Sequence, residues 1–206
     1  MLSTSLARHY LPYLQQRLTP ARLEHSLGVM RIMGELADVY RLDRKQAMLA
    51  GLLHDIAKDD SHTQLLTLAE ENNVVFDDPC ERHPVYLHAT IGAYLTRTLC
   101  NIHDARILEA IATHSYIGPP QHVHTVFAWS LRFADVLAPV HEWRGMRKLK
   151  SIVYRGRSEQ AAVLISNWLL EYFTHEQIPL HPQLHAIYAE LASHISVDDG
   201  FFDKGE

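Results

Sequence analysis

Apolar residues recur at spacings of three and four along nearly the whole chain of 206 residues, and no sustained alternation with a period of two is present. The first spacing is typical of α-helices that bury one face, whereas strands would need the alternation. The sequence therefore predicts an all-α fold, a single-domain helical bundle. The expected helices span residues 5–18, 20–40, 44–58, 61–71, 85–99, 104–113, 122–140, 159–173 and 182–194.

Local signals place the ends of several of these helices. Pro12 lies inside the first helix and predicts a kink or a split there, because proline lacks the backbone donor that a helix interior needs. Thr19 followed by Pro20 is typical of a helix start, with Thr19 as the N-cap. Asp43 and Ser61 are expected to begin the third and fourth helices in the same way.

Composition indicates one folded unit. With 47% hydrophobic and 21% charged residues, the chain is long enough for one substantial core. The segments "NNVVFDDPCERHP" and "YIGPPQ" are expected to be loops because of their Asn, Asp, Pro and Gly content. We expect an N-terminal helical segment at residues 1–18, the main domain at 19–195 and an acidic tail at 196–206.

The charge balance narrows the classes of partner. A formal charge of -5 and a sequence pI near 6.3 give no broad basic footprint, so nucleic acid and anionic membranes are not expected partners. A small anionic substrate would need a local positive site, such as bound metals. Cys80 and Cys100 form no CxxC motif, and no long apolar signal or membrane-spanning run is present. A cytoplasmic protein is expected, and a homodimer is one candidate assembly.

Metal-binding residue types lie on several of the expected helices. Two of them are carboxylates in apolar surroundings: Asp55 follows "AMLAGLLH", and Asp135 lies within "SLRFADVLAP". An unpaired buried charge is costly, so such groups are normally paired or bound to a metal. The full set of candidate ligands is His25, His54, Asp55, His88, His114 and Asp135.

Each of these residues also has a simpler interpretation. A single helical histidine is more often part of the core or the surface than a ligand. Asp135 could pair with Arg132, one helical turn away. The ordered set of His, His-Asp, His, His and Asp, spread over different helices, favours a metal site over these alternatives.

The segments "RLEHSLGVMRIMGELA", "AMLAGLLHDIAK", "YLHATIGAYL", "AIATHS" and "RFADVLAP" carry a resemblance to a known family. They resemble the HD superfamily of metal-dependent phosphohydrolases, and most closely its bacterial YqeK-type branch of symmetrical diadenosine tetraphosphate hydrolases. The resemblance extends from about Thr19 to about Tyr188. It implies an all-helical fold and a centre of two metals, commonly iron, with the motif Asp55 bridging them.

Carried onto this sequence, the resemblance divides the ligands into two sets. One metal would be held by His25, His54, Asp55 and Asp135. The other would be held by Asp55, His88 and His114. Imidazoles with carboxylates suit iron, manganese, cobalt or zinc better than magnesium or calcium. Two such cations about 3.5–4 Å apart can activate a bridging hydroxide to attack phosphorus and stabilise the departing oxygen.

Asp55 and Lys58 are the candidate catalytic residues. Lys58 stands four residues after His54 on the same expected helix, one turn further along the same face, and is the first candidate for holding a substrate phosphate. Arg22, three residues before His25, is the next. Each also has a simpler interpretation, Lys58 as a solvated lysine at a helix end and Arg22 as a surface arginine in the first turns of its helix.

The chain departs from the YqeK-type pattern late in the site. The family's usual Glu is Ala138 here, and the position of its Arg is taken most nearly by His141. Arg144, about one helical turn further on, is a candidate substitute for the missing guanidinium, and His141 is kept as a candidate substrate contact. The metal ligands are retained while these neighbouring polar residues are not, so the sequence supports the hydrolytic centre better than it supports the substrate.

Three functions therefore stay open. The first is hydrolysis of a dinucleoside polyphosphate, with diadenosine tetraphosphate cut into two ADP. The second is hydrolysis of another nucleotide or phosphoester. The third is a nucleotide-sensing module without turnover, which the complete ligand set disfavours.

Overall fold

The computed structural model describes residues 2–76, 78–115, 126–138 and 145–194, and every regular element in these ranges is a helix. The all-α prediction is confirmed. The helices are α1 (Leu2–Arg17), α2 (Pro20–Tyr40), α3 (Arg44–Leu53), α4 (His62–Glu71), the 3-10 helix η1 (Pro79–Arg82), α5 (Pro84–Thr98), α6 (Ala105–Thr113), α8 (Val126–Leu137), α9 (Met146–Tyr154), α10 (Ser158–His175) and α11 (Pro182–His194).

Helix starts follow the sequence signals closely. Thr19 is the N-cap of α2 with proline in the first turn, but its side chain makes no capping hydrogen bond. The side chain of Asp43 accepts a hydrogen bond from the Gln46 backbone, and Ser61 forms a reciprocal capping box at α4. Pro12 does not split the first helix: α1 continues through it. Pro12 faces solvent, where water can satisfy the backbone group that the ring leaves without a partner.

Three expectations from the sequence were wrong. The helix expected at 44–58 ends at Leu53, and the chain continues in turns through Asp59. Its apolar run gives no sign of this end because every residue at 47–57 is buried, in the helix and in the turns alike. The 3-10 helix η1 lies in a segment expected to be a loop. Helix α9 was not anticipated, although Leu149, Ile152 and Val153 bury one face of it.

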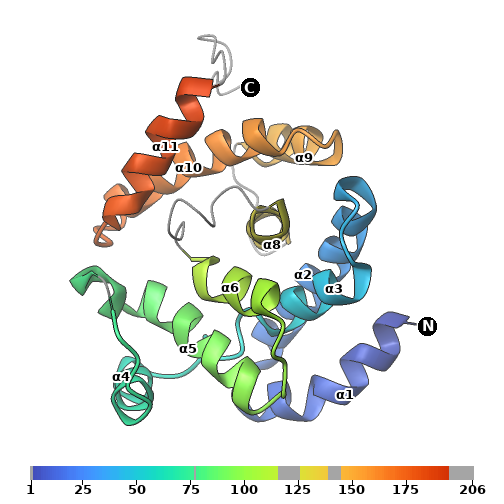
Figure 1. Cartoon of the computed structure of the whole chain (residues 1–206), viewed down its shortest axis with the longest axis vertical. Helices are drawn as coiled ribbons and strands as arrows, with labels where there is room; N and C mark the ends of the chain where they lie inside the picture. The colour runs from blue at the N-terminus through green and yellow to red at the C-terminus, as the bar shows by residue number, and fades with distance from the viewer. Residues whose placement is uncertain (1, 77, 116–125, 139–144, 195–206) are drawn as a thin grey trace.

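Helix α8 lies near the middle of the molecule, and Figure 1 shows it almost end-on. Helices α2 and α3 pack beside it, and α5 and α6 lie on another side. Helices α9 and α10 also pack against it, and α11 packs on α10. A Cβ built on Gly51 would lie 2.9 Å from the Met30 Cα, so only glycine allows α2 and α3 this close an approach. The approach brings the end of α3 against α2.

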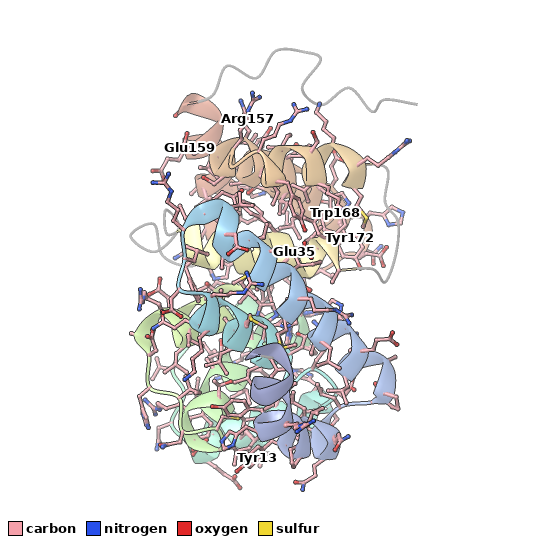
Figure 2. All side chains as sticks on the ribbon, turned by 90° about the vertical axis from the view of Figure 1, so that its right-hand side faces the viewer. Tyr13, Glu35, Arg157, Glu159, Trp168 and Tyr172 are labelled. Carbon is pink, nitrogen blue, oxygen red and sulfur yellow. The ribbon has the colours of Figure 1, made fainter. Side chains whose placement is uncertain are left out.

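The C-terminal helices are joined to this central group by polar contacts. The Tyr40 hydroxyl donates to the Val153 carbonyl over 2.8 Å, and the Tyr154 hydroxyl donates to Glu35. Figure 2 shows Arg157 and Glu159 at one end of the molecule and Tyr13 of α1 at the other. Among the described residues, no helix combines the length and the hydropathy that a membrane crossing requires.

Candidate metal centre

All six candidate ligands come together in the interior of the molecule. They lie on α2 (His25), in the turn directly after α3 (His54, Asp55), on α5 (His88), at the C-cap of α6 (His114) and on α8 (Asp135). The expectation that His54 and Asp55 lie inside a helix was wrong, because α3 ends at Leu53. That end turns both side chains toward the other four residues.

One half of the cluster gathers around Asp135. The Oδ1 of Asp135 lies 3.0 Å from the Nε2 of His25 and 3.6 Å from the Nε2 of His54. The same His54 nitrogen is 3.6 Å from the Oδ2 of Asp55. The side chain of Asp135 is 28% exposed, so this half has an open edge.

The other half gathers around the second oxygen of Asp55. Its Oδ1 lies 3.3 Å from the Nε2 of His88 and 3.3 Å from the Nε2 of His114. The two imidazole nitrogens are 3.2 Å apart. Asp55 thus faces both halves of the cluster with different oxygens, as a bridging carboxylate would.

Backbone carbonyls fix the tautomers of three imidazoles. The Nδ1 of His54 donates to the Gly51 carbonyl over 2.9 Å, and the Nδ1 of His88 donates to the Pro84 carbonyl over 2.9 Å. The Nδ1 of His114 donates to the Ile111 carbonyl over 2.7 Å. A carbonyl can only accept, so each Nδ1 carries a proton and each Nε2 is directed into the cluster, which is the usual arrangement of metal-binding histidines.

Burial and charge set the protonation of the cluster. Burial alone would raise the pKa of Asp55, yet His54, Lys58 and the two neighbouring imidazoles hold it well below its usual value. The pKa of Asp135 is also held low against burial, chiefly by hydrogen bonding to His25 and by His54. Both carboxylates are therefore ionised at neutral pH.

The pKa values of the histidines are shifted in different directions. Burial, with the charge of Lys58, lowers the pKa of His88 to about 4. Burial also lowers the pKa of His114. Burial would lower the pKa of His54 too, but the charges of Asp55 and Asp135 outweigh the effect of burial, and the pKa of His54 is raised. His88 and His114 are therefore neutral at neutral pH, the form that binds a metal.

A cation fits this set of donors. The Nε2 of His54 and the Oδ1 of Asp55 are buried and have no hydrogen-bond partner among the described residues. Buried polar atoms without partners are costly unless something else satisfies them. Imidazole nitrogens around shared carboxylates are the donors that transition metals prefer. The sets His25–His54–Asp55, His54–His114–Asp135 and Asp55–His88–His114 each place their ligand atoms within 4.8 Å of one another.

The candidate substrate residues are at the edge of the cluster. Lys58 was expected on the same helix as His54, but it lies in the turns that follow α3. Its Nζ lies 3.1 Å from the Nε2 of His88. The Nη1 of Arg22 is 4.0 Å from Asp55, and its side chain is 41% exposed. His141 and Arg144 lie outside the described residues.

Two neighbours of the cluster were not anticipated as part of it. The Ser115 hydroxyl is buried and lies 3.3 Å from the Nε2 of His88. Arg132 is buried on α8 and donates to the Ser115 carbonyl over 3.0 Å, in place of the pairing with Asp135 considered from the sequence. Adjacency to His114 could have pointed to Ser115, whereas the contact of Arg132 requires the fold.

The region of the chain that contains the cluster matches a known family. The HD domain family model matches residues 22–144, a range that includes all six clustered residues. The chain belongs to the HD domain family. The resemblance inferred from the sequence is thereby confirmed, and family membership carries the hydrolase class with it.

Individual relatives are similar to this chain over most of its length. It is 27% identical to the symmetrical bis(5'-nucleosyl)-tetraphosphatase of Halalkalibacterium halodurans, over 88% of this chain and 94% of that one. It is 26% identical to the protein of the same name from Bacillus subtilis, over 89% and 96%. The crystal structure of a predicted HD superfamily hydrolase involved in NAD metabolism from Clostridium acetobutylicum superimposes with a TM-score of 0.80 at 25% identity, covering 89% of this chain and 95% of that one.

Proposed function

We propose that this HD protein hydrolyses a dinucleoside polyphosphate, with diadenosine tetraphosphate cut symmetrically into two ADP. The observation that carries the proposal is Asp55 in a buried cluster, whose Oδ2 faces His54 and whose Oδ1 faces His88 and His114. The names of the relatives from Halalkalibacterium halodurans and Bacillus subtilis support the choice of substrate.

The proposed cofactor is a pair of transition metal ions, with iron as the first choice. His25, His54, Asp55 and Asp135 would hold one ion, and Asp55, His88 and His114 the other. When bound, such a pair supplies an activated water and neutralises charge on the oxygens of the phosphoryl group. Nitrogen and carboxylate donors also suit manganese, cobalt and zinc.

The chain's own residues would orient the polyphosphate. Arg22 presents its guanidinium at the exposed edge of the cluster and lies 3.7 Å from Asp59, which restrains the side chain. Lys58 carries a positive charge directly beside His88. Both can bind phosphoryl oxygens of a substrate at the edge of the cluster, since cationic side chains are suited to phosphate.

One observation keeps a different phosphoester as the second candidate. Ala138 occupies the position of the family's usual glutamate. It is buried, and its Cβ lies 3.9 Å from the place that a Cβ on Gly28 would take. An alanine supplies no polar group for a nucleotide. The nucleotide preference can therefore differ from that of the family. Ala138 is not one of the candidate metal ligands, so we expect the metal centre itself to be retained. We propose that the reaction takes place in the cytoplasm.

The test combines metal content and reaction products. Wild-type protein should carry about two transition metals per chain, in keeping with two clusters of donors, and should yield ADP alone from diadenosine tetraphosphate. Asp55→Ala should lose both properties. Asp38→Ala is the matched control, because Asp38 is an exposed aspartate on α2 that pairs with Arg44.

The outcomes separate the two candidates. Two metals without cleavage of diadenosine tetraphosphate would move the substrate to another phosphoester. Wild-type protein without metal, or Asp55→Ala with unchanged turnover, would refute the hydrolytic centre.

A further inference from the structure

Arg132 is a buried cation close to the cluster. It lies on α8, three residues before Asp135, and is 5% exposed. Burial lowers the pKa of its guanidinium to about 10, which leaves it charged at neutral pH. No carboxylate of the described residues lies within ion-pair distance of it. A buried charge is costly unless it is paired or hydrogen-bonded, so the hydrogen bond that Arg132 does make matters.

Arg132 donates a hydrogen bond at the end of another helix. Its Nη2 donates over 3.0 Å to the carbonyl of Ser115, the residue that follows the C-cap of α6. Carbonyls at a helix C-terminus lack partners within the helix and carry partial negative charge. A guanidinium is therefore well matched to this place, and it connects α8 with the end of α6.

That connection spans both halves of the cluster. His114 directly precedes Ser115, and the Ser115 hydroxyl lies 3.3 Å from His88. Asp135 is one helical turn beyond Arg132 on α8. The same side chain thus links the helix that carries Asp135 to the turn that carries His114 and contacts His88.

We propose that Arg132 is a positioning residue, which holds the His114–Ser115 turn against α8 and so keeps the His88–His114 half in register with the Asp135 half. This inference rests on the metal centre proposed above. Residues that orient metal ligands typically contribute about 10–100-fold to metal affinity. Loss of Arg132 should weaken the half that contains His88 and His114, since its hydrogen bond is made to that half.

The test is a titration of chelator-treated protein with Mn²⁺ alone, together with its thermal unfolding. Wild type should bind two ions. Arg132→Met should keep one site and weaken the other by about 10–100-fold, with an unfolding midpoint close to that of wild type under chelator. Arg132→Lys keeps one donor for the Ser115 carbonyl and should lose less affinity. Arg147→Met, an exposed arginine on α9, is the control.

The results distinguish this inference from the proposed function. Wild type without Mn²⁺ binding would refute the metal centre, and the inference with it. Wild type with two sites and Arg132→Met also with two unchanged sites would refute only the role of Arg132. Equal weakening by Met and Lys, or weakening of both sites, would refute it as well. If Arg132→Met does not fold, Arg132→Gln replaces it, with the same contrast to Arg132→Lys expected.

Discussion

The orientation of the imidazoles is decided within a few residues of each one. The Nδ1 groups of His54, His88 and His114 all donate to a carbonyl three or four residues earlier in the chain. The turn or helix that carries each histidine thus also orients it. His25 differs, because its Nδ1 is buried without a hydrogen-bond partner among the described residues. Its orientation depends on Asp135, 3.0 Å from its Nε2.

Cys100 allows a test of burial at the scale of one residue, away from the cluster. It is 6% exposed, and burial raises the pKa of its thiol to about 11. At a pH of about 8 the folded thiol should be protonated, and only the thiolate reacts readily with disulfide reagents. We expect Cys100 to be labelled only as the protein unfolds, measured by mass spectrometry with Cys100→Ala as the control.

The same shift in pKa makes folding stability depend on pH. The folded thiol keeps its proton up to a pH of about 11, whereas the ordinary pKa of a cysteine thiol is 9.0. The unfolded chain therefore loses its proton first, and this contribution to the free energy of unfolding is complete below pH 9.0 and declines as the pH rises toward 11. Urea unfolding of wild type and Cys100→Ala should diverge in this window. An identical pH dependence of the two proteins would contradict the shift.

At the scale of elements, the sequence predicted most helices because their buried faces repeat with the helical period. It failed where that signal is absent. The buried run at 47–57 continues past the end of α3, so periodicity could not locate the turn that presents His54 and Asp55. The ligand residues could still be chosen, because their chemistry is visible in the sequence. The contact of Arg132 with Ser115 could not, since it joins two helices through a backbone carbonyl.

The crossing of α2 and α3 gives a prediction for this scale. A Cβ at Gly51 would lie 2.9 Å from the Met30 Cα, and a backbone atom cannot move aside locally. Gly51→Ala should lower the free energy of unfolding by about 1–3 kcal/mol through overpacking. Gly34→Ala is the matched control: its Cβ would meet only the flexible Met48 and Arg44 side chains at 3.4 and 3.5 Å. Equal effects of the two substitutions in urea unfolding would contradict the proposed close approach.

At the scale of the molecule, the C-terminal helices are attached to the helix that carries His88. His181, just before α11, and Glu81 of η1 are both buried, with 3.0 Å between the His181 Nε2 and the Glu81 Oε1. The Tyr86 hydroxyl on α5 donates over 2.5 Å to the Pro179 carbonyl. These contacts join segments about a hundred residues apart, so they stabilise the whole fold rather than one element.

The pair of His181 and Glu81 should therefore behave as one unit. His181→Ala leaves the Glu81 carboxyl buried without this partner, and a buried polar group that loses its partner costs about 1–3 kcal/mol. Glu81→Ala should cost a similar amount, and the double variant should cost less than the sum of the two, because the second substitution removes a side chain that has already lost this contact. Urea unfolding with a chelator present measures this without a contribution from bound metal. Strictly additive losses would show that this contact does not hold the start of α11 to η1.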